Sequence, residues 1–417
     1  MPTVIVIGGG AAGLLAAGRS AECGAKVILL ERGPVLARKL RISGKGRGNI
    51  TNTAVLEDFI AAFGPNGKFM YGAFSRFFRD DLLQLLNKLG VPTKSERGGR
   101  VFPSSDQAED VVMAFERWIK SLGVQIKYNT RVKRIMVEDG KAGGVETYSG
   151  PVRADKVILA TGGISYPKTG STGDGYIMAQ ELGHEIVPPR PSLSALVAEE
   201  PWVKRLQGLS LRNVKAALYL DAKKITQEFG EMIFTHFGVS GPIIFTLSKQ
   251  AADALKDGKV ALSVNLKPAL SAEQLDQRLV RDFAQTKHFK NYLPDLLPRT
   301  LIPVIIDLTG IPADTPVNKI TVPQRKDMVR LLHDLRMTIR AARPVDEAIV
   351  TAGGVAIKEI DPRSMESKLI SGLYFAGEII DIDAITGGYN LQAAFSTGWV
   401  AGDSAAITPV FRDLNGA

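Results

Sequence analysis

The feature that most constrains this chain is a glycine-rich turn between a predicted strand and a predicted helix near its start. Residues 3–7 form a short β-branched run, which is typical of a strand buried on both faces. The pattern Gly8-x-Gly10-x-x-Gly13 follows, and helical and strand patterns come next. In such a unit the first glycine permits a tight turn, the second lets the backbone approach a diphosphate, and the third lets helix and strand pack closely. We therefore expect a nucleotide-binding βαβ unit, with the phosphates held by Gly8, Gly10, Ala11, Ala12 and Gly13.

A carboxylate stands where a ribose-binding residue is expected. Glu31 ends the second predicted strand, 18 residues after Gly13. A carboxylate at that place accepts hydrogen bonds from both hydroxyls of a ribose. It also argues against a ribose 2′-phosphate, because two anions would repel each other. A purely structural turn is the alternative interpretation of the glycines.

The segment 38–52 favours FAD over NAD as the nucleotide. It lies within residues 33–53, which show no clean hydrophobic period and are therefore predicted to be a loop. It packs five basic residues, three glycines and several side-chain donors into fifteen positions. Cations and amides in this number can neutralise the phosphates of a long, extended dinucleotide. The expected ligands in and beside this loop are Arg32, Arg38, Lys39, Ser43, Gly44, Arg47, Asn49, Thr51 and Asn52. A solvated loop or a nucleic-acid surface is the alternative, but the loop lacks the aromatic residues of a base-stacking surface.

Two later turns point to the same cofactor. A predicted strand runs into a glycine turn that contains Thr161 and Gly162, which is a second close backbone approach. Another predicted strand ends in Gly377 and Glu378, and this carboxylate can accept hydrogen bonds from ribityl hydroxyls. The helix that starts near Asn390 directs amides and the positive end of its dipole at a flavin edge where negative charge collects on reduction. Ordinary helix caps are the alternative for each turn alone.

Composition changes along the chain predict an interrupted domain. Three prolines within 187–191 form a rigid connector. Short alternating runs over 193–235 predict an antiparallel sheet or barrel, and helical periods follow over 271–334. After about residue 344 the chain returns to the strands and glycine turns of its beginning. The expected fold class is α/β, with a discontinuous dinucleotide-binding domain that is interrupted by an insertion.

Six motifs together resemble a known family. They are GGGAAG, SGKGRGNITN, GGRVFP, ATGGISYPKTGSTGDG, FTHFGVSGP and GLYFAGEIIDIDAITGGYNLQAAFSTGWVAG. Over nearly the whole chain the sequence resembles a bacterial family of FAD flavoproteins, the NAD(P)/FAD-dependent oxidoreductases that include aminoacetone-oxidase-family enzymes. The resemblance implies a glutathione-reductase-like FAD-binding Rossmann domain, interrupted by an inserted β-barrel that carries a helical subdomain. The implied boundaries are 1–190 and 344–417 for the FAD-binding domain, 191–268 and 335–343 for the barrel, and 269–334 for the helical subdomain.

The resemblance also implies particular cofactor contacts. Adenine would be contacted through the backbone of Val132, and the flavin by Gly388, Asn390 and Leu391. The family usually carries a cysteine in the basic loop where this chain has Gly48. With no cysteine or histidine in that loop, we expect FAD to be bound non-covalently.

Flavin carries the redox chemistry, so the protein needs only a proton donor or acceptor near the reacting atoms. His236 has suitable chemistry, and a hydrogen-bonded structural histidine is its alternative. Tyr166 can donate to a substrate carbonyl, and a ring packed against a loop is its alternative. We predict these two residues as catalytic candidates. Tyr389, next to the flavin helix, is placed to shape a substrate pocket.

Composition excludes several other classes of site. Hydrophobic residues make up 45% and charged residues 23% of the chain, as in ordinary globular proteins. The single cysteine, Cys23, excludes an intrachain disulfide, and the four histidines are too scattered for a metal motif, so we expect no metal. No run of about 18 apolar residues occurs, so we expect a cytoplasmic protein with no membrane association.

The sequence leaves three functions open. The leading hypothesis is an FAD-dependent oxidoreductase that moves a hydride between flavin N5 and a small-molecule substrate, with NAD(P)H or dioxygen as second substrate. Because no second strand–GxGxxG–helix unit is present, NAD(P)H would bind transiently. The alternatives are a tRNA-modifying flavoprotein and a non-catalytic FAD-binding module. The net charge of +9 permits a nucleic acid, but we do not expect one, because flavoproteins of that kind rely on cysteine. The oligomeric state is not predicted.

Overall fold

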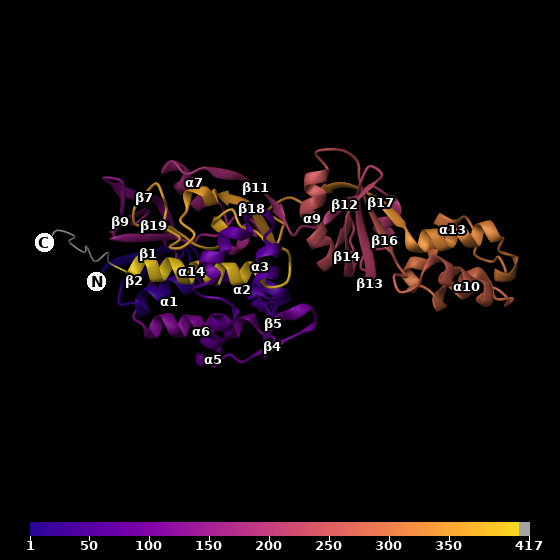
Figure 1. The fold of residues 1–417 in the computed structure, drawn as a ribbon, viewed down its shortest axis with the longest axis horizontal. Helices are drawn as coiled ribbons and strands as arrows, with labels where there is room; N and C mark the ends of the chain where they lie inside the picture. The colour runs from indigo at the N-terminus through magenta and orange to yellow at the C-terminus, as the bar shows by residue number, and fades with distance from the viewer. Residues whose placement is uncertain (408–417) are drawn as a thin grey trace. The chain divides into compact units, whose positions relative to one another are not determined.

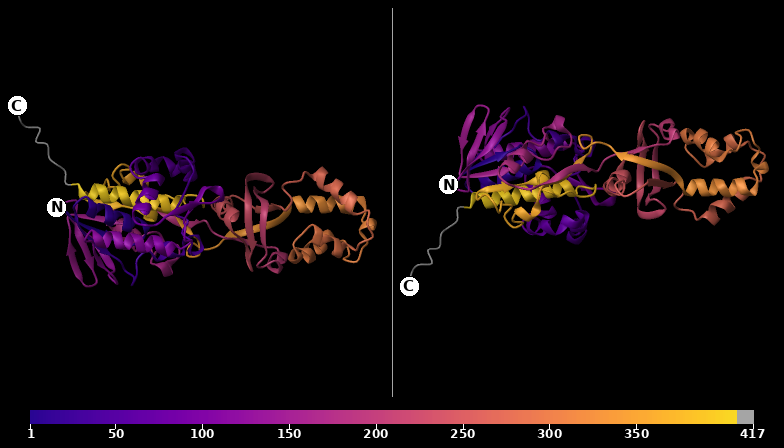
Figure 2. Two further views of the ribbon diagram at one scale, coloured as in Figure 1. Left: turned by 90° about the horizontal axis from the view of Figure 1, so that it is seen from below. Right: turned by 90° about the horizontal axis from the view of Figure 1, so that it is seen from above.

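The computed structural model describes residues 1–407 and divides into two compact units (Figures 1 and 2). Unit 1 consists of Met1–Pro191 together with the chain from Val345 onwards, and unit 2 consists of Ser192–Pro344. The first and last parts of the chain therefore fold together, although unit 2 separates them in sequence.

Unit 1 is built on a parallel sheet with the strand order β19-β10-β1-β2-β6. Its strands are β1 Thr3–Ile7, β2 Lys26–Leu30, β6 Gln125–Lys127, β10 Lys156–Leu159 and β19 Leu373–Phe375. Ile7, at the end of β1, lies opposite Leu30 of β2 and Leu159 of β10. The carboxyl ends of these strands thus meet at one edge, which is where open α/β sheets bind their ligands.

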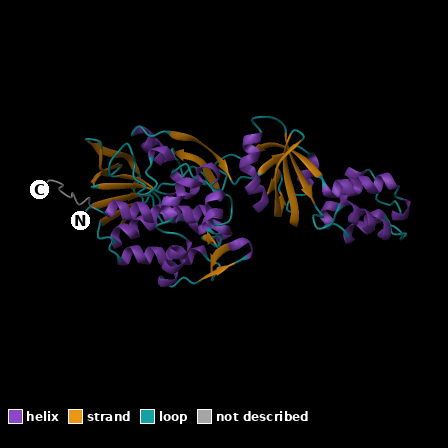
Figure 3. Cartoon of the chain, viewed as in Figure 1, coloured by secondary structure: helices purple, strands orange, loops and turns teal. Residues whose placement is uncertain are grey.

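Helices cover this sheet, and two of them approach each other closely (Figures 1 and 3). The helices of unit 1 are α1 Ala11–Glu22, α2 Arg38–Ile42, α3 Leu56–Ala62, α4 Tyr71–Phe74, α5 Arg79–Lys88, α6 Ala108–Ser121, α7 Asp174–Glu181 and α14 Tyr389–Ala406. A Cβ on Gly398 of α14 would overlap the carbonyl oxygen of Ala12 in α1, and one on Gly402 would overlap that of Ala16. Backbone atoms cannot rotate away, so these two glycines let α1 and α14 pack side by side.

Three smaller sheets complete unit 1. They are β3–β5–β4 (Thr51–Asn52, Arg100–Pro103, Thr93–Ser95), β7–β8–β9 (Val132–Glu138, Lys141–Thr147, Gly150–Arg153) and β11–β18 (Ile186–Ser192, Val350–Val355). The prediction of loop throughout 33–53 was wrong, because α2 and β3 lie within it. One short helix and a two-residue strand carry too few apolar positions to show a period.

Unit 2 is a closed barrel with the strand order β12-β15-β14-β13-β16-β17. Its strands are β12 Leu196–Ala198, β13 Ser210–Leu220, β14 Lys223–Phe234, β15 Gly238–Ser240, β16 Val260–Asn265 and β17 Leu335–Ala342. Along β17 the buried Leu335, Met337 and Ile339 alternate with the exposed Arg336 and Arg340. The alternation separates an apolar interior from a polar exterior, and closure leaves no free strand edge.

The helices of unit 2 are α8 Pro201–Arg205, α9 Pro242–Ala254, α10 Ala272–Asp282, α11 Phe289–Tyr292, α12 Ile302–Thr309 and α13 Val322–His333. Ser271 and Thr321 cap α10 and α13, each accepting a hydrogen bond from the amide three residues later. The two units confirm the predicted α/β class with an inserted barrel, whereas the predicted domain boundaries stay predictions. None of the helices in residues 1–407 has both the length and the apolar character needed to cross a membrane.

Candidate functional site

The turn after β1 shows which of its glycines the protein's own packing requires. Gly8 has a φ of +101°, and a Cβ there would lie 2.5 Å from the carbonyl oxygen of Ala160. A Cβ on Gly13 would overlap the carbonyl oxygen of Gly8. At Gly10, in contrast, a Cβ would meet no atom within 4 Å. Gly8 and Gly13 are therefore needed for packing, while Gly10 borders open space.

This open space lies at the N-terminus of α1. Gly10 is the N-cap of the helix, no side chain caps it, and its first turn contains no acidic residue. The amides of Ala11, Ala12 and Gly13 thus have no intrahelical acceptor, and the positive end of the helix dipole is not neutralised. Such a helix end fits an anionic diphosphate.

Glu31, at the end of β2, is nearly buried and held by the backbone on both sides. One carboxylate oxygen accepts from the amide of Gly9 at 2.9 Å, and the other accepts from the amide of Gly33 at 2.7 Å. Each carboxylate oxygen has a second acceptor site. The carboxylate is therefore fixed in orientation and retains the capacity to accept from two ribose hydroxyls.

A cavity of about 310 Å³ opens beside Glu31, and its lining residues are Asn129, Thr130, Arg131, Thr147, Tyr148 and Ser149. The amide of Thr130 donates to the Glu31 carbonyl at 2.8 Å. Val132, whose backbone the family resemblance assigns to adenine, follows this segment directly and is buried. The cavity is thus at the place where the nucleotide end of a dinucleotide would lie if Glu31 binds its ribose.

Lys39 and Glu378, which are far apart in sequence, form an ion pair. The Lys39 Nζ lies 2.7 Å from one oxygen of Glu378 and donates to Ser165 Oγ at 2.6 Å. Glu378 also accepts from Ser165 Oγ at 2.9 Å and from the amide of Thr351 at 2.7 Å. Sequence reasoning missed Ser165 and Thr351, because nothing local to either marks it as a partner of this carboxylate.

The predicted basic ligands differ in what they contact. Arg47 lies against Glu96 and Asp106, 2.5 and 2.6 Å away, and these hydrogen bonds raise the pKa of its guanidinium further. Arg32 hydrogen-bonds Thr172 and Asp174. Arg47 thus anchors its loop to the β4–β5 segment.

Arg38 is exposed and forms no ion pair among the described residues, so it is the predicted cation with the least compensated charge. Ser43, Gly44 and Asn49 lie in the turn after α2, where the Ser43 hydroxyl donates to the Leu40 carbonyl at 2.7 Å.

The N-terminus of α14 is packed against the end of the basic loop. A Cβ on Gly388 would overlap the carbonyl oxygen of Thr51. Asn52 Nδ2 donates to the carbonyl of Gly387 at 2.9 Å. The Asn390 side chain both accepts from and donates to the backbone of Ala384, each at 2.9 Å. The Asn390 side chain therefore fixes a neighbouring loop, which leaves its backbone amide and that of Leu391 as the groups able to face a ligand.

Three buried oxygen atoms on these segments have no hydrogen-bond partner: Thr51 Oγ1, Thr161 Oγ1 and Gln392 Oε1. A buried unpaired polar atom costs free energy. Thr161 Oγ1 faces Gly175 of α7, where an added Cβ would overlap it. Thr51 and Gln392 lie on the two segments that pack at the N-terminus of α14, and their two unpaired atoms fit a site that a polar ligand completes. Gly8 contacts the Thr161 turn, Gly377 adjoins Ala12, and both turns belong to the edge at which α1 begins. The residues present therefore fit FAD, although each individual contact stays a prediction. Gln392 was not among the predicted contacts, although it directly follows Asn390 and Leu391 in the same motif.

The catalytic candidates lie in different units. Tyr166 is in unit 1, is 36% exposed and has a φ of +51°, an uncommon conformation for a non-glycine residue. His236 is in unit 2, between β14 and β15, and packs edge-on to Phe237. Tyr389 stacks its ring edge against Phe59 in the core, and burial raises the pKa of its hydroxyl. The catalytic roles of Tyr166 and His236 stay predictions.

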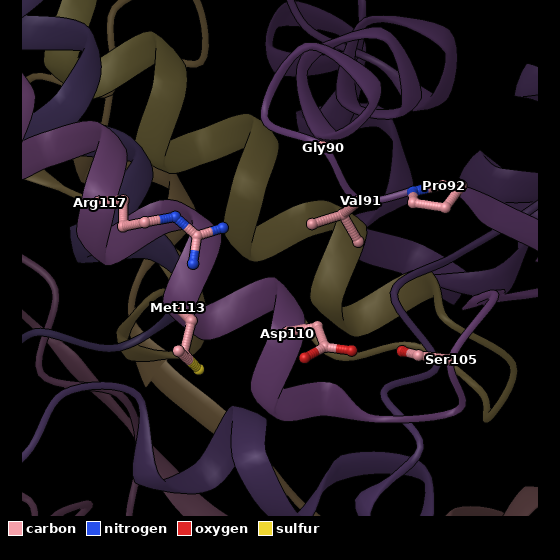
Figure 4. A pocket seen from close by; sticks show the side chains of 7 residues that line it. All are labelled: Gly90, Val91, Pro92, Ser105, Asp110, Met113 and Arg117. Carbon is pink, nitrogen blue, oxygen red and sulfur yellow. The ribbon is translucent and has the colours of Figure 1, made fainter.

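A second cavity, of about 190 Å³, is separate from this site (Figure 4). It is lined by Gly90, Val91, Pro92, Ser105, Asp110, Met113 and Arg117. Asp110, Met113 and Arg117 come from α6, and none of the seven belongs to the glycine turns or the basic loop. Within residues 1–407, no cluster of His, Cys, Asp and Glu is arranged to hold a metal ion.

Comparison with known proteins identifies the family of this chain. The family model described as HI0933-like protein Rossmann domain matches residues 2–404. A 3-dehydro-bile acid delta(4,6)-reductase of Clostridium scindens is 32% identical over 414 residues, covering 98% of this chain and 100% of the relative. A ribosomal RNA dihydrouridine synthase of Escherichia coli is 30% identical over 397 residues, covering 95% of this chain and 96% of the relative.

Among solved structures, a 3-ketosteroid delta1-dehydrogenase from Sterolibacterium denitrificans resembles this chain with a TM-score of 0.53 at 12% identity. The likeness covers 97% of this chain and all of that one. At this identity it is a likeness of fold, and it includes the insertion as well as the dinucleotide-binding part.

Proposed function

Because this chain belongs to the family described as HI0933-like protein Rossmann domain and is a flavin-dependent oxidoreductase, we propose that it reduces a carbon–carbon double bond conjugated with a carbonyl group. The family membership confirms the resemblance inferred from the motifs, and with it the prediction of a flavin-dependent enzyme. The reductive direction and the kind of bond are the new content of the proposal.

One observation carries this proposal: two relatives that align along almost the whole chain share a reaction on unlike substrates. The name of the C. scindens relative describes reduction of double bonds in a 3-keto ring system. The name of the E. coli relative describes formation of dihydrouridine, which is uridine with its ring double bond reduced. In both molecules a double bond is conjugated with a carbonyl. A steroid-like ketone and a nucleobase share little else, so this bond is the common element.

In this proposal unit 1 holds FAD without a covalent link. The diphosphate lies at Gly10 and the N-terminus of α1, the ribose at Glu31, and the flavin near the N-terminus of α14. The Lys39–Glu378 pair fixes the turns on either side. When bound, flavin supplies a hydride at its N5.

Reduction of a conjugated double bond also needs a proton at the carbon next to the carbonyl. Tyr166 is our proposed donor in unit 1, because it is partly exposed and follows Ser165 in the chain, and Ser165 contacts the Lys39–Glu378 pair. His236 is the proposed alternative in unit 2. Tyr166→Phe and His236→Gln variants distinguish the two candidates. Replacing the residue that donates the proton should leave the rate of flavin reduction unchanged and abolish reoxidation of the flavin by substrate.

Anaerobic reoxidation of the reduced holoenzyme tests the reaction class. The bound flavin is first reduced photochemically, so that the test does not depend on NADH or NADPH. We expect 2-cyclohexen-1-one or progesterone to restore the absorbance of oxidised flavin, with a product two mass units heavier than the substrate. Cyclohexene and cyclohexanone, which each lack half of the conjugated system, should leave the flavin reduced.

The proposal is wrong if dioxygen restores the oxidised flavin rapidly and no conjugated ketone or uridine-containing RNA does so. A parallel experiment with NADH and NADPH as reductants identifies the second substrate. Neither nucleotide has a dedicated domain here, so we expect weak, saturable reduction without a stable complex.

A further inference from the structure

Unit 2 carries most of the net positive charge of the chain. Residues 192–344 contain 22 lysines and arginines against 15 aspartates and glutamates, which leaves them seven of the nine net positive charges. The rest of the chain, although longer, is close to balanced. The glycine turns and the basic loop lie in unit 1, so the dinucleotide site does not account for this surplus. A charge surplus of this size indicates an anionic partner for unit 2.

Part of this charge lies on the outer face of four adjacent barrel strands. Lys215 of β13 lies opposite Phe229 of β14 and opposite Asn265 of β16. Four residues further along β13, Tyr219 lies opposite Lys224 of β14. Residues directly opposite in an antiparallel pair share a face, and so do alternate residues of one strand. Ala216 and Leu218, which alternate with these residues along β13, are fully buried in the barrel core, so the face that carries Lys215 and Tyr219 points outward.

The fourth strand continues the same face. Arg336 of β17 lies opposite Ser263 of β16, and Arg340 follows on the same side of β17. The Arg336 guanidinium lies 4.6 Å from the centre of the Tyr219 ring and is paired with Asp334. We call this outward set the barrel platform; it consists of Lys215, Tyr219, Lys224, Phe229, Arg336 and Arg340.

The barrel platform combines two chemistries. Phe229 is 50% exposed, so much of its ring is open to solvent on this face. The Tyr219–Arg336 stack offers a second flat, polarisable surface. Lys215, Lys224 and Arg340 form no ion pair among the described residues, so three charges are available to a polyanion. Flat rings interleaved with cations are the combination that binds unpaired nucleobases through their faces and the backbone through its phosphates.

We propose that the barrel platform binds single-stranded RNA. Single strands are named because only unpaired bases expose a face that can stack on the Phe229 ring and on the Arg336 guanidinium that covers Tyr219. RNA is named because uracil contains the conjugated double bond that the reaction needs, and in this respect the inference rests on the proposed function. Two sequence arguments spoke against a nucleic acid: the 38–52 loop lacks aromatic residues, and tRNA-modifying flavoproteins rely on cysteine, of which this chain has only Cys23. The barrel platform lies outside that loop and supplies aromatic residues, and the proposed reduction takes its proton from Tyr166 or His236 rather than from a cysteine.

Fluorescence anisotropy of the FAD-loaded full chain with a labelled 16-nucleotide oligouridine tests this directly. We expect saturable binding. The logarithm of the association constant should fall with the logarithm of the salt concentration at a slope of about −2, because three counterions are released from a single strand. A duplex of the same length should bind more weakly. The readout needs no turnover, so it is independent of the reductase test.

Two variants separate the two chemistries of the barrel platform. Phe229→Ala should weaken binding about tenfold and leave the salt slope unchanged, because it removes a stacking ring and no charge. Lys224→Ala should reduce the salt slope by about 0.7, because one counterion fewer is released. The matched controls are Tyr71→Ala, which removes an aromatic ring 47% exposed on unit 1, and Lys319→Ala, which removes an exposed cation elsewhere on unit 2. Both controls should bind as the native chain does, with native circular dichroism in all four variants.

The proposal is overturned if oligouridine does not bind at low salt, if the duplex binds more tightly than the single strand, or if Phe229→Ala binds like the native chain. If RNA binding fails while conjugated ketones still reoxidise the flavin, the proposed function stands and only this inference falls. If RNA binds at the barrel platform while no conjugated bond is reduced, the RNA-binding inference stands and the proposed function falls.

Discussion

Substituting Gly10 with alanine separates cofactor binding from folding. The backbone at Gly10 has a φ of −79° and a ψ of −169°, which alanine adopts without strain. The added Cβ would meet no protein atom within 4 Å. The protein without cofactor should therefore keep its stability, or gain up to about 1 kcal/mol because its unfolded chain loses freedom.

The same methyl group would stand where the proposal places the diphosphate. A hydrogen bond to a charged group contributes about 1.5–3 kcal/mol, so the loss of one predicts a Kd for FAD about 10- to 150-fold higher. The assay is quenching of FAD fluorescence during titration with cofactor-free protein, together with the Tm of that protein without FAD. A larger loss of affinity would mean that more than one amide contact is displaced.

Gly13→Ala is the matched control, because it adds the same methyl group three residues away. There the Cβ would overlap the carbonyl oxygen of Gly8, and neither backbone can move aside. This variant should lower the Tm even without FAD. The reasoning is refuted if Gly10→Ala binds FAD with the native Kd, or if it destabilises the cofactor-free protein as much as Gly13→Ala does.

Three further predictions concern other parts of unit 1. Lys39→Met leaves the carboxylate of Glu378 without its cation, so this variant should weaken FAD binding. A double-mutant cycle of FAD affinity with Glu378→Gln should give a coupling free energy of about 1–2 kcal/mol. Strictly additive losses of affinity would contradict the pairing. Burial holds the pKa of His184 below its ordinary value of 6.5, so the imidazole binds a proton more tightly in the unfolded chain than in the folded one. The free energy of unfolding should therefore fall as the pH drops below 6.5 toward the folded-state pKa. The urea midpoint of His184→Gln should therefore change less than that of the native chain between about pH 7.5 and about pH 5.5, and equal changes would exclude this account. Acid precipitation should release all the flavin, because the basic loop has Gly48 in place of a cysteine; a yellow pellet would show a covalent link.

The local geometry of the first turn could be predicted from sequence because each glycine there has a local cause. Gly8 needs a positive φ, and Gly13 needs an approach too close for any Cβ. The position of Glu31 followed in the same way, since a strand of known length ends there. These features depend on residues within about thirty positions of one another, where the chain has little freedom to choose a different partner.

The roles of the charged residues could not be predicted in this way. Arg47 was expected among the phosphate ligands, and the structure shows it bound to Glu96 and Asp106. Basic composition gives the number of cations in a loop, but their partners come from segments that only folding brings near. The same reason hid Ser165 and Thr351 as partners of Glu378.

The sequence by itself determined the dinucleotide-binding unit, the interruption of that unit by a second one, and the membership of a flavoprotein family. These depend on backbone conformations and strand patterns that single residues dictate. Only the tertiary structure decided which charges are neutralised and which remain available, because ion pairs form between positions up to 384 residues apart. It also decided that Lys215, Phe229 and Arg336 share one outer face, since closing the barrel sets the register that aligns them.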